Sequence, residues 1–139
     1  MPVPPAPVAN YIPAVRSGNL VFLSGHGPNQ LKGRQWRGKV GQEIGLEAAQ
    51  MAAKACVLNL LASLRSEIGE LSRVRRVVKL LGMVNCTPDF GAQPQVINGA
   101  SDLLVSLFGE RGRHARSAVG MAALPGDIPV EIEMIVEVE

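Results

Sequence analysis

Residues 114–120 (HARSAVG) and 124–133 (LPGDIPVEIE) decide the fold of this chain. They predict two antiparallel strands joined at Pro125-Gly126, because proline presets φ at the first central position of a type II turn and glycine accepts the positive φ of the second. In that register Gly120 faces Glu131, and Arg116 faces Ile135. One side of the hairpin then carries small and charged residues, namely Arg116, Ala118, Gly120, Ala122, Glu131, Glu133 and Ile135. The other side is apolar and predicts the core, with Val119, Met121, Val130, Ile132, Met134, Val136 and Val138.

Arg116 is the candidate functional residue of this hairpin, since an arginine on a strand costs stability unless an anion answers its charge. Its planar fork of donors suits a carboxylate, so we interpret it as the handle for a small carboxylate substrate. Four residues separate Arg116 from the partner of Glu131, about 13 Å along a strand, which leaves room for a ligand. The alternative is a structural arginine that pairs with a surface glutamate and keeps a sheet edge soluble. The spacing alone leaves both interpretations open, and a register slip of one residue would remove the pocket.

Composition bounds the class of protein. The 139 residues suffice for one domain, which we place at 10–139 after a flexible proline-rich start at 1–9. A net charge of +2 is too balanced for a dedicated nucleic-acid-binding protein. The two cysteines, Cys56 and Cys86, are too few for a disulfide scaffold or a metal cluster and suit a reducing compartment. The chain shows neither a signal peptide nor an apolar run of membrane-spanning length, so we expect a cytoplasmic protein that avoids membranes.

Hydrophobic periodicity and turn residues predict the remaining elements. Strands are expected at 11–16, 20–24 and 74–86, with a further strand in the basic, glycine-punctuated segment 32–40. Helices are expected at 46–68 and 94–108, each ending at a glycine. This order predicts an α+β layer, a mixed sheet with two helices on one face. The uncovered face predicts a homo-oligomer with pockets at its subunit boundaries.

The pattern after the proline-rich start resembles the Rid (YjgF) family of reactive intermediate deaminases, also called the L-PSP endoribonuclease family. The residues that carry the resemblance are Tyr11, Ser17-Gly18-Asn19, Phe22-Leu23-Ser24-Gly25, Ile68-Gly69, Val77-Val78-Lys79, Val84-Asn85, Pro88-Asp89-Phe90, Asn98, Ala115-Arg116-Ser117, Leu124-Pro125 and Val130-Glu131-Ile132-Glu133. Three places depart from the common pattern: Ala118 stands where family deaminases often have cysteine, His114 where proline is common, and residues 98–102 (NGASD) where larger, more aromatic residues are usual. These departures indicate a divergent subgroup.

The resemblance implies a chorismate-mutase-like fold, a trimer whose sheets form a central barrel with three clefts between subunits. It also implies hydrolysis of imines or enamines, such as 2-aminoacrylate and its 2-imino acid tautomer, to 2-keto acids and ammonia without a metal or organic cofactor. Carried over by position, Arg116 binds the substrate carboxylate and Glu131 positions water, while Tyr11 closes the cleft from a neighbouring subunit. The remaining substrate-binding positions that we expect are Ser24, Gly25 and Ala118.

We therefore expect an imine deaminase for small 2-imino acids. One alternative is a non-catalytic module of the same fold that binds a small carboxylate or regulates through the trimer, which the missing cysteine favours. A third interpretation is an endoribonuclease, because basic clusters at 73–79 and around Trp36 could meet phosphates. Solvated structural charge explains those clusters better, and no pair of histidines at catalytic spacing supports RNA cleavage. The roles of His26 and His114 stay open.

Overall fold

The computed structural model describes residues 1–139. Its helices lie where the alanine-rich and leucine-rich segments predict them: α1 spans Leu46–Ile68 and α2 spans Gln93–Phe108. The bounds of α1 are those predicted, and α2 begins one residue earlier than predicted. The two helices approach closely, since a Cβ at Gly99 of α2 would lie 2.2 Å from the carbonyl oxygen of Gln50 in α1.

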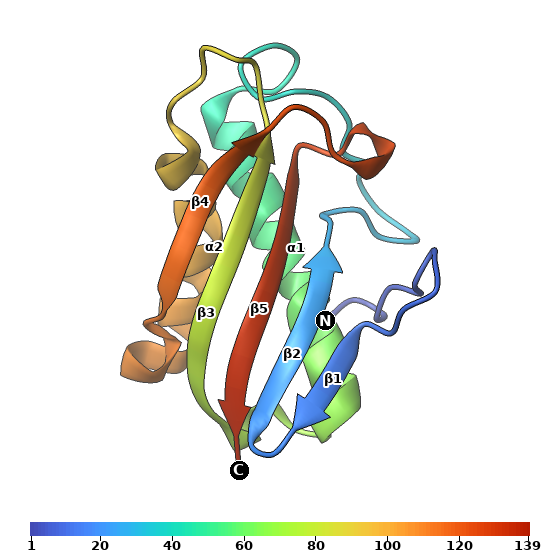
Figure 1. Cartoon of the computed structure of the whole chain (residues 1–139), viewed down its shortest axis with the longest axis vertical. Helices are drawn as coiled ribbons and strands as arrows, with labels where there is room; N and C mark the ends of the chain where they lie inside the picture. Colours follow the sequence, from blue (N-terminus) through green and yellow to red (C-terminus); the bar gives the residue numbers. More distant parts are fainter.

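Five strands form one mixed sheet, and both helices cover the same face of it (Figure 1). In chain order the strands are β1 (Ala14–Ser17), β2 (Leu20–His26), β3 (Val74–Asn85), β4 (Ala115–Met121) and β5 (Val130–Val138). Across the sheet their order is β1-β2-β5-β3-β4. Short 3-10 turns lie at Leu71–Arg73, Gly109–Gly112 and Pro125–Asp127. The predicted α+β architecture, two helices on one face of a mixed sheet, is confirmed.

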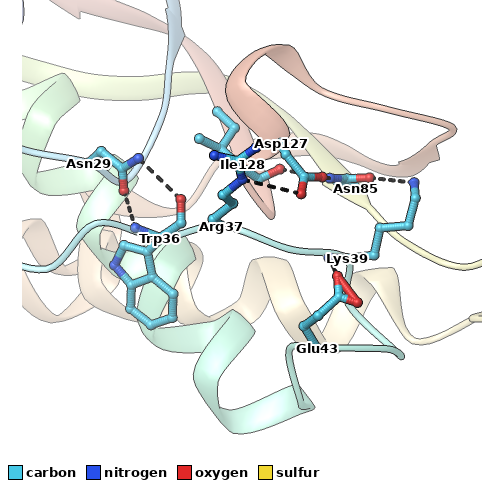
Figure 2. A network of polar contacts seen from close by, with 8 residues as sticks. All are labelled: Asn29, Trp36, Arg37, Lys39, Glu43, Asn85, Asp127 and Ile128. Atoms are coloured by element: carbon cyan, nitrogen blue, oxygen red, sulfur yellow. Dashed lines mark hydrogen bonds and ion pairs between the residues drawn. The ribbon is translucent and has the colours of Figure 1, made fainter.

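The predicted strand at 32–40 is wrong, because this segment contains no strand. Gly33 and Gly38 have φ values of 130° and 125°, a backbone conformation that interrupts an extended run. The segment is instead anchored by Trp36, which is 5% exposed and whose backbone N–H donates to the side chain of Asn29 (Figure 2). The segment is therefore anchored by two buried apolar side chains, Trp36 and Val40, rather than by the face of a strand.

The predicted hairpin between β4 and β5 is also wrong, because β3 lies between them (Figure 1). β4 pairs with β3 in parallel after the crossover through α2, and β5 pairs antiparallel with β3 on its other side. Residues 122–129 therefore pass the end of β3. Gly126 has the positive φ (66°) predicted for the second central position of the turn, and the backbone N–H of Asp127 donates to the carbonyl oxygen of Leu124 at 3.0 Å, so the turn forms in this loop rather than in a hairpin. A two-residue turn joins only adjacent strands, so the turn signal was assigned to the wrong pair.

The observed register separates two residues that the hairpin would have placed on one side. Residues level with one another in neighbouring strands point to the same face of a sheet. Arg116 is level with Leu80 and through it with Met134, so it faces the helices. Glu131 is level with Met83 and faces the open side. Arg116 and Glu131 therefore lie on opposite faces of the sheet.

The apolar side of β5 is buried as predicted, with its five inward residues at most 1% exposed: Val130, Ile132, Met134, Val136 and Val138. The assignments for β4 are reversed. Val119 and Met121, predicted to face the core, alternate onto the open face, where Val119 is 38% exposed. Ala118 and Gly120, predicted to lie beside the glutamates, face the helices instead. The alternation within each strand was right, but the face of β4 depends on its partner, β3.

The open face of the sheet is apolar as well as uncovered. Val15 and Phe22 are 48% and 42% exposed, and with Leu81 and Ile135 they border a shallow cavity of about 430 Å³. Lys79 is the cation at this cavity. Large exposed apolar areas of this kind are typical of surfaces that contact another protein. No helix in the structure has the length and hydropathy needed to cross a lipid bilayer.

Asn85, fully buried at the end of β3, holds together the two loops that meet there (Figure 2). Its Nδ2 donates to Asp127 Oδ1 and to the carbonyl oxygen of Ile128, both at 3.1 Å, and its Oδ1 accepts from Lys39 Nζ at 2.7 Å. Arg37 pairs with the same aspartate at 3.9 Å. The loop that returns the chain from β4 to β5 is thus fixed by side chains rather than by a hairpin ladder.

Candidate functional site

Arg116 points from β4 toward α2, where two neutral oxygens hold its guanidinium. Nη1 donates to Ser101 Oγ at 3.0 Å, and Nη2 donates to the carbonyl oxygen of Pro94 at 3.1 Å. No carboxylate lies within ion-pair distance, since the single ion pair of the structure joins Arg37 and Asp127. Arg116 therefore does not pair with a glutamate of its own chain, although β4 is an edge strand, as the structural alternative assumed. This half-buried arginine keeps a positive charge that its own chain does not neutralise.

Glu131 points from β5 to the open face, beside Gly25 of β2. A Cβ at Gly25 would lie 2.2 Å from Glu131 Oε2, so the glycine leaves the space that the carboxyl group occupies. Burial, and secondly the charge of Glu133, raises the pKa of Glu131 above its ordinary value. Glu131 is thus a carboxyl group that keeps its proton to a higher pH than a solvated glutamate does.

Tyr11 and Gly25 border one small hollow of about 100 Å³, which the proline-rich residues 5–7 also line. Tyr11 is 43% exposed. Ser24 precedes the hollow on β2, but its hydroxyl donates to the carbonyl oxygen of Ile12 at 2.8 Å and so attaches the N-terminal segment. Within one chain, Tyr11 and Ser24 therefore lie near Gly25 and not near Arg116.

The predicted site residues therefore form two groups in a single chain. The first group consists of Gly25 and Glu131, which are in contact, with Tyr11 and Ser24 next to them. Arg116 and Ala118 form the other group on the helix side of β4, where Ala118 packs partly against the core. The sheet separates the groups, so a small ligand that touches Arg116 cannot also touch Glu131 of the same chain.

Comparison with known proteins assigns this chain to a protein family. Residues 1–135 match the sequence model of the family described as "YjgF/chorismate mutase-like, putative endoribonuclease". The chain belongs to the YjgF (Rid) family. The match spans nearly the whole chain, and it confirms the resemblance inferred from Tyr11 through Glu133.

One of the relatives of this YjgF-family chain carries the name of an enzyme activity. Protein TCP17 of Trypanosoma cruzi is 44% identical over 138 residues, which covers 99% of this chain and 86% of that protein. The 2-iminobutanoate/2-iminopropanoate deaminase of Dermatophagoides farinae is 31% identical over 139 residues, covering 99% and 93%. A solved structure from Agrobacterium tumefaciens, of unknown function, superposes with a TM-score of 0.90 at 46% identity, covering 94% and 83%. The family is consistent with a Rid-type deaminase or an endoribonuclease-like function.

Sequence reasoning missed Ser101 as a partner of Arg116. In this YjgF-family chain Ser101 Oγ also lies 2.9 Å from Nε2 of His114. Both residues fall at positions where the sequence departs from the common family pattern, which was the signal available. Two of the departures are therefore adjacent in the fold, because Ser101 contacts the guanidinium of Arg116 and His114 contacts Ser101.

A cavity of about 540 Å³ at the end of β4 was also missed; Gly120, Gln93 and Lys39 are among its lining residues. Lys39 Nζ donates to Asn85 Oδ1 and to the carbonyl oxygen of Ala122. Like Arg116, this ammonium group is held by neutral oxygens. Arg116 on the helix side of β4 and Lys39 at the end of β4 are thus two cations held by neutral oxygens.

Metal ligation and thiol chemistry find no support in the side-chain arrangement. No three His, Cys, Asp or Glu side chains are placed to share a metal ion. Cys56 and Cys86 are free and buried. Burial, with Glu131 as the second cause, raises the pKa of Cys56 well above its ordinary value, so this thiol stays protonated at neutral pH.

Proposed function

We propose that this chain is an imine deaminase, which hydrolyses small 2-imino acids of the 2-aminoacrylate type to 2-keto acids and ammonia. In this proposal Arg116 holds the substrate carboxylate. The observation that carries the proposal is the state of this guanidinium, which is half-buried, oriented by Ser101 and Pro94, and free of any acidic partner. A charge kept in that condition is suited to an anionic ligand, and a planar fork is suited to a carboxylate.

We further propose that the site is completed by a second copy of the chain in a homotrimer. Arg116 and Glu131 of one chain lie on opposite faces of the sheet, so both can reach one small ligand only if they come from different subunits. The open face offers the surface for such an assembly, because it exposes Val15, Phe22 and Val119. Tyr11, Ser24 and Gly25 then belong to the Glu131 side of the shared cleft.

Imine hydrolysis requires few catalytic functions from Arg116 and Glu131. A free imine is already electrophilic, so its hydrolysis needs an anchored substrate, a positioned water and proton transfers. Arg116 supplies the anchoring. The raised pKa of Glu131 suits a carboxyl group that exchanges protons with water nearer to neutral pH than a solvated glutamate does.

The experiment generates an imino acid in situ with an amino-acid oxidase and follows its lifetime by competition with semicarbazide. Wild-type protein is expected to shorten that lifetime and to release keto acid and ammonia together, while Arg116→Ala loses the effect. Binding of pyruvate without acceleration would support the regulatory module instead. Cleavage of RNA that survives Arg116→Ala would support the endoribonuclease.

A further inference from the structure

The guanidinium of Arg116 is the first member of a chain of hydrogen bonds. Its Nη1 donates to Ser101 Oγ at 3.0 Å, and that oxygen lies 2.9 Å from His114 Nε2. His114 Nδ1 lies 2.6 Å from the carbonyl oxygen of Gly112. The serine is on α2, the histidine precedes β4, and all three side chains are half-buried rather than sealed from solvent.

The direction of each hydrogen bond follows from the groups themselves. A carbonyl oxygen only accepts, so His114 Nδ1 carries a hydrogen and, in the neutral ring, Nε2 is the acceptor. The hydroxyl of Ser101 therefore donates to Nε2 while its oxygen accepts from Arg116. Burial first, and the charge of Arg116 as a smaller cause, lowers the pKa of His114. The ring is thus a neutral base near neutral pH.

A second serine–histidine pair in the same chain shows what is special about this one. His26 Nε2 lies 2.7 Å from Ser63 Oγ, and His26 Nδ1 lies 2.6 Å from the carbonyl oxygen of Ser24. The bonding is the same, but His26 is 4% and Ser63 is 3% exposed. No arginine takes part in that pair, which joins β2 to α1, although His26 also lines the small hollow bordered by Tyr11 and Gly25.

We propose that Ser101 and His114 form a proton relay for the ligand held by Arg116. The inference rests on the proposed deaminase function and names two further residues of that site. Water adds to the imine carbon and gives a proton to Ser101 Oγ, as the serine proton passes to His114 Nε2. The relay returns this proton to the imine nitrogen, which gives the neutral carbinolamine with one hydroxyl and one amino group. The same relay then carries the hydroxyl proton to the nitrogen as the C=O bond forms and the C–N bond breaks, so that keto acid and ammonia leave with His114 neutral again.

The charged groups around the relay are few. Arg116 faces it from β4, Asp102 follows Ser101 on α2, and Arg113 precedes His114. Among these, Arg116 is the one that lowers the pKa of His114. A carboxylate bound at Arg116 cancels part of that charge, so ligand binding and proton uptake by His114 favour each other.

The test compares His114→Gln and Ser101→Ala with Ser63→Ala, which removes the matched buried pair, and with Ser101→Thr, which keeps the hydroxyl. His114→Gln is expected to lower kcat on the order of 100-fold with KM within about threefold, the effect of losing general acid–base transfer. Ser101→Ala is expected to lower kcat similarly and also to raise KM, because Arg116 Nη1 loses a hydrogen-bond partner. Ser101→Thr is expected to retain most activity. His114→Gln is expected to remove the acid limb of the pH–rate profile, and Ser63→Ala to leave it in place.

A readout without turnover accompanies this assay: the pKa of His114, followed by NMR, is expected to rise when pyruvate binds. Wild-type kinetics in His114→Gln, or pyruvate binding that leaves the pKa of His114 unchanged, would overturn the relay and leave the deaminase proposal standing. Wild-type protein that neither binds pyruvate nor hydrolyses the imine would overturn both. The two failures are therefore distinguishable.

Discussion

Arg116 and Glu131 lie on opposite faces of one sheet, on the two strands that flank β3. Glu131 packs against Gly25 on the open side, whereas Arg116 contacts Ser101 of α2 on the other. Within a chain the two side chains point away from each other. In the proposed trimer, an activity that uses both therefore depends on how two chains meet, and a variant in either residue would act on a different subunit of the shared site.

Mixing two inactive variants tests this arrangement directly. Arg116→Ala and Glu131→Gln homo-oligomers are each expected to be inactive in imine hydrolysis. When the two chains are co-expressed and assemble at random, about one interface in four receives both intact residues, so roughly a quarter of wild-type activity is expected to return. Double-variant chains mixed with wild type give the matching control. No recovery in oligomers shown by mass to be mixed would mean that one chain supplies both residues.

Binding of a keto acid tests the role of the guanidinium separately from catalysis. Arg116→Lys keeps the charge but loses the planar fork, so pyruvate affinity is expected to fall about tenfold to a hundredfold, the value of one hydrogen bond to a charged group. Calorimetric titration measures the change. Arg37→Ala, which removes an exposed cation that pairs with Asp127, serves as the control. Equal affinity in wild type and Arg116→Lys would show that the charge alone, or another cation such as Lys39, binds the anion.

The raised pKa of Glu131 predicts a dependence of stability on pH. Between the ordinary glutamate pKa and the higher folded-state value, the folded protein binds more protons than the unfolded chain, so stability falls as pH rises through that window. Glu131→Gln removes this penalty. The variant is expected to melt at a higher temperature than wild type above the window and to differ less below it.

Melting curves from pH 4 to pH 8 measure the effect, with Glu137→Gln on the same strand as the comparison variant. If the melting temperature of wild type rises relative to that of Glu131→Gln as the pH rises, the carboxylate of Glu131 has a stabilising partner in the assembled protein. The proposed proton-exchanging role then loses its support.

The helices and the inward residues of β5 were predictable because their signals are local, whereas the local pattern of residues 32–40 wrongly predicted a strand. The apolar spacing of α1 and the glycine at each helix end lie within a few residues of the element they define. The inward residues of β5 were also correct, since alternation belongs to one strand. The partner of β4 was not predictable in this way. The turn residues Pro125 and Gly126 are equally compatible with a hairpin and with a loop that passes the end of β3.

The same limit applies to the candidate site. Arg116 and Glu131 could be singled out by residue type and by resemblance, because each is a charge on an otherwise apolar strand. Their relative placement depends on how β4 and β5 each pair with β3, and the sequences of β4 and β5 alone do not reveal that pairing. Ser101 is 15 residues from Arg116 along the chain. Only the packing of α2 on β4 brings its hydroxyl to the guanidinium.

The close contact between α1 and α2 predicts that a substitution at Gly99 destabilises the protein. Alanine is favoured over glycine in a helix interior by about 1 kcal/mol, but a Cβ at Gly99 would lie 2.2 Å from the backbone oxygen of Gln50. Forcing the helices apart is expected to cost about 1–3 kcal/mol, so Gly99→Ala should lower the free energy of unfolding in urea. Gly91→Ala is the control, since a Cβ there meets nothing within 4 Å. A Gly99→Ala variant at least as stable as wild type would contradict this close contact, and with it the position of α2 that brings Ser101 to Arg116.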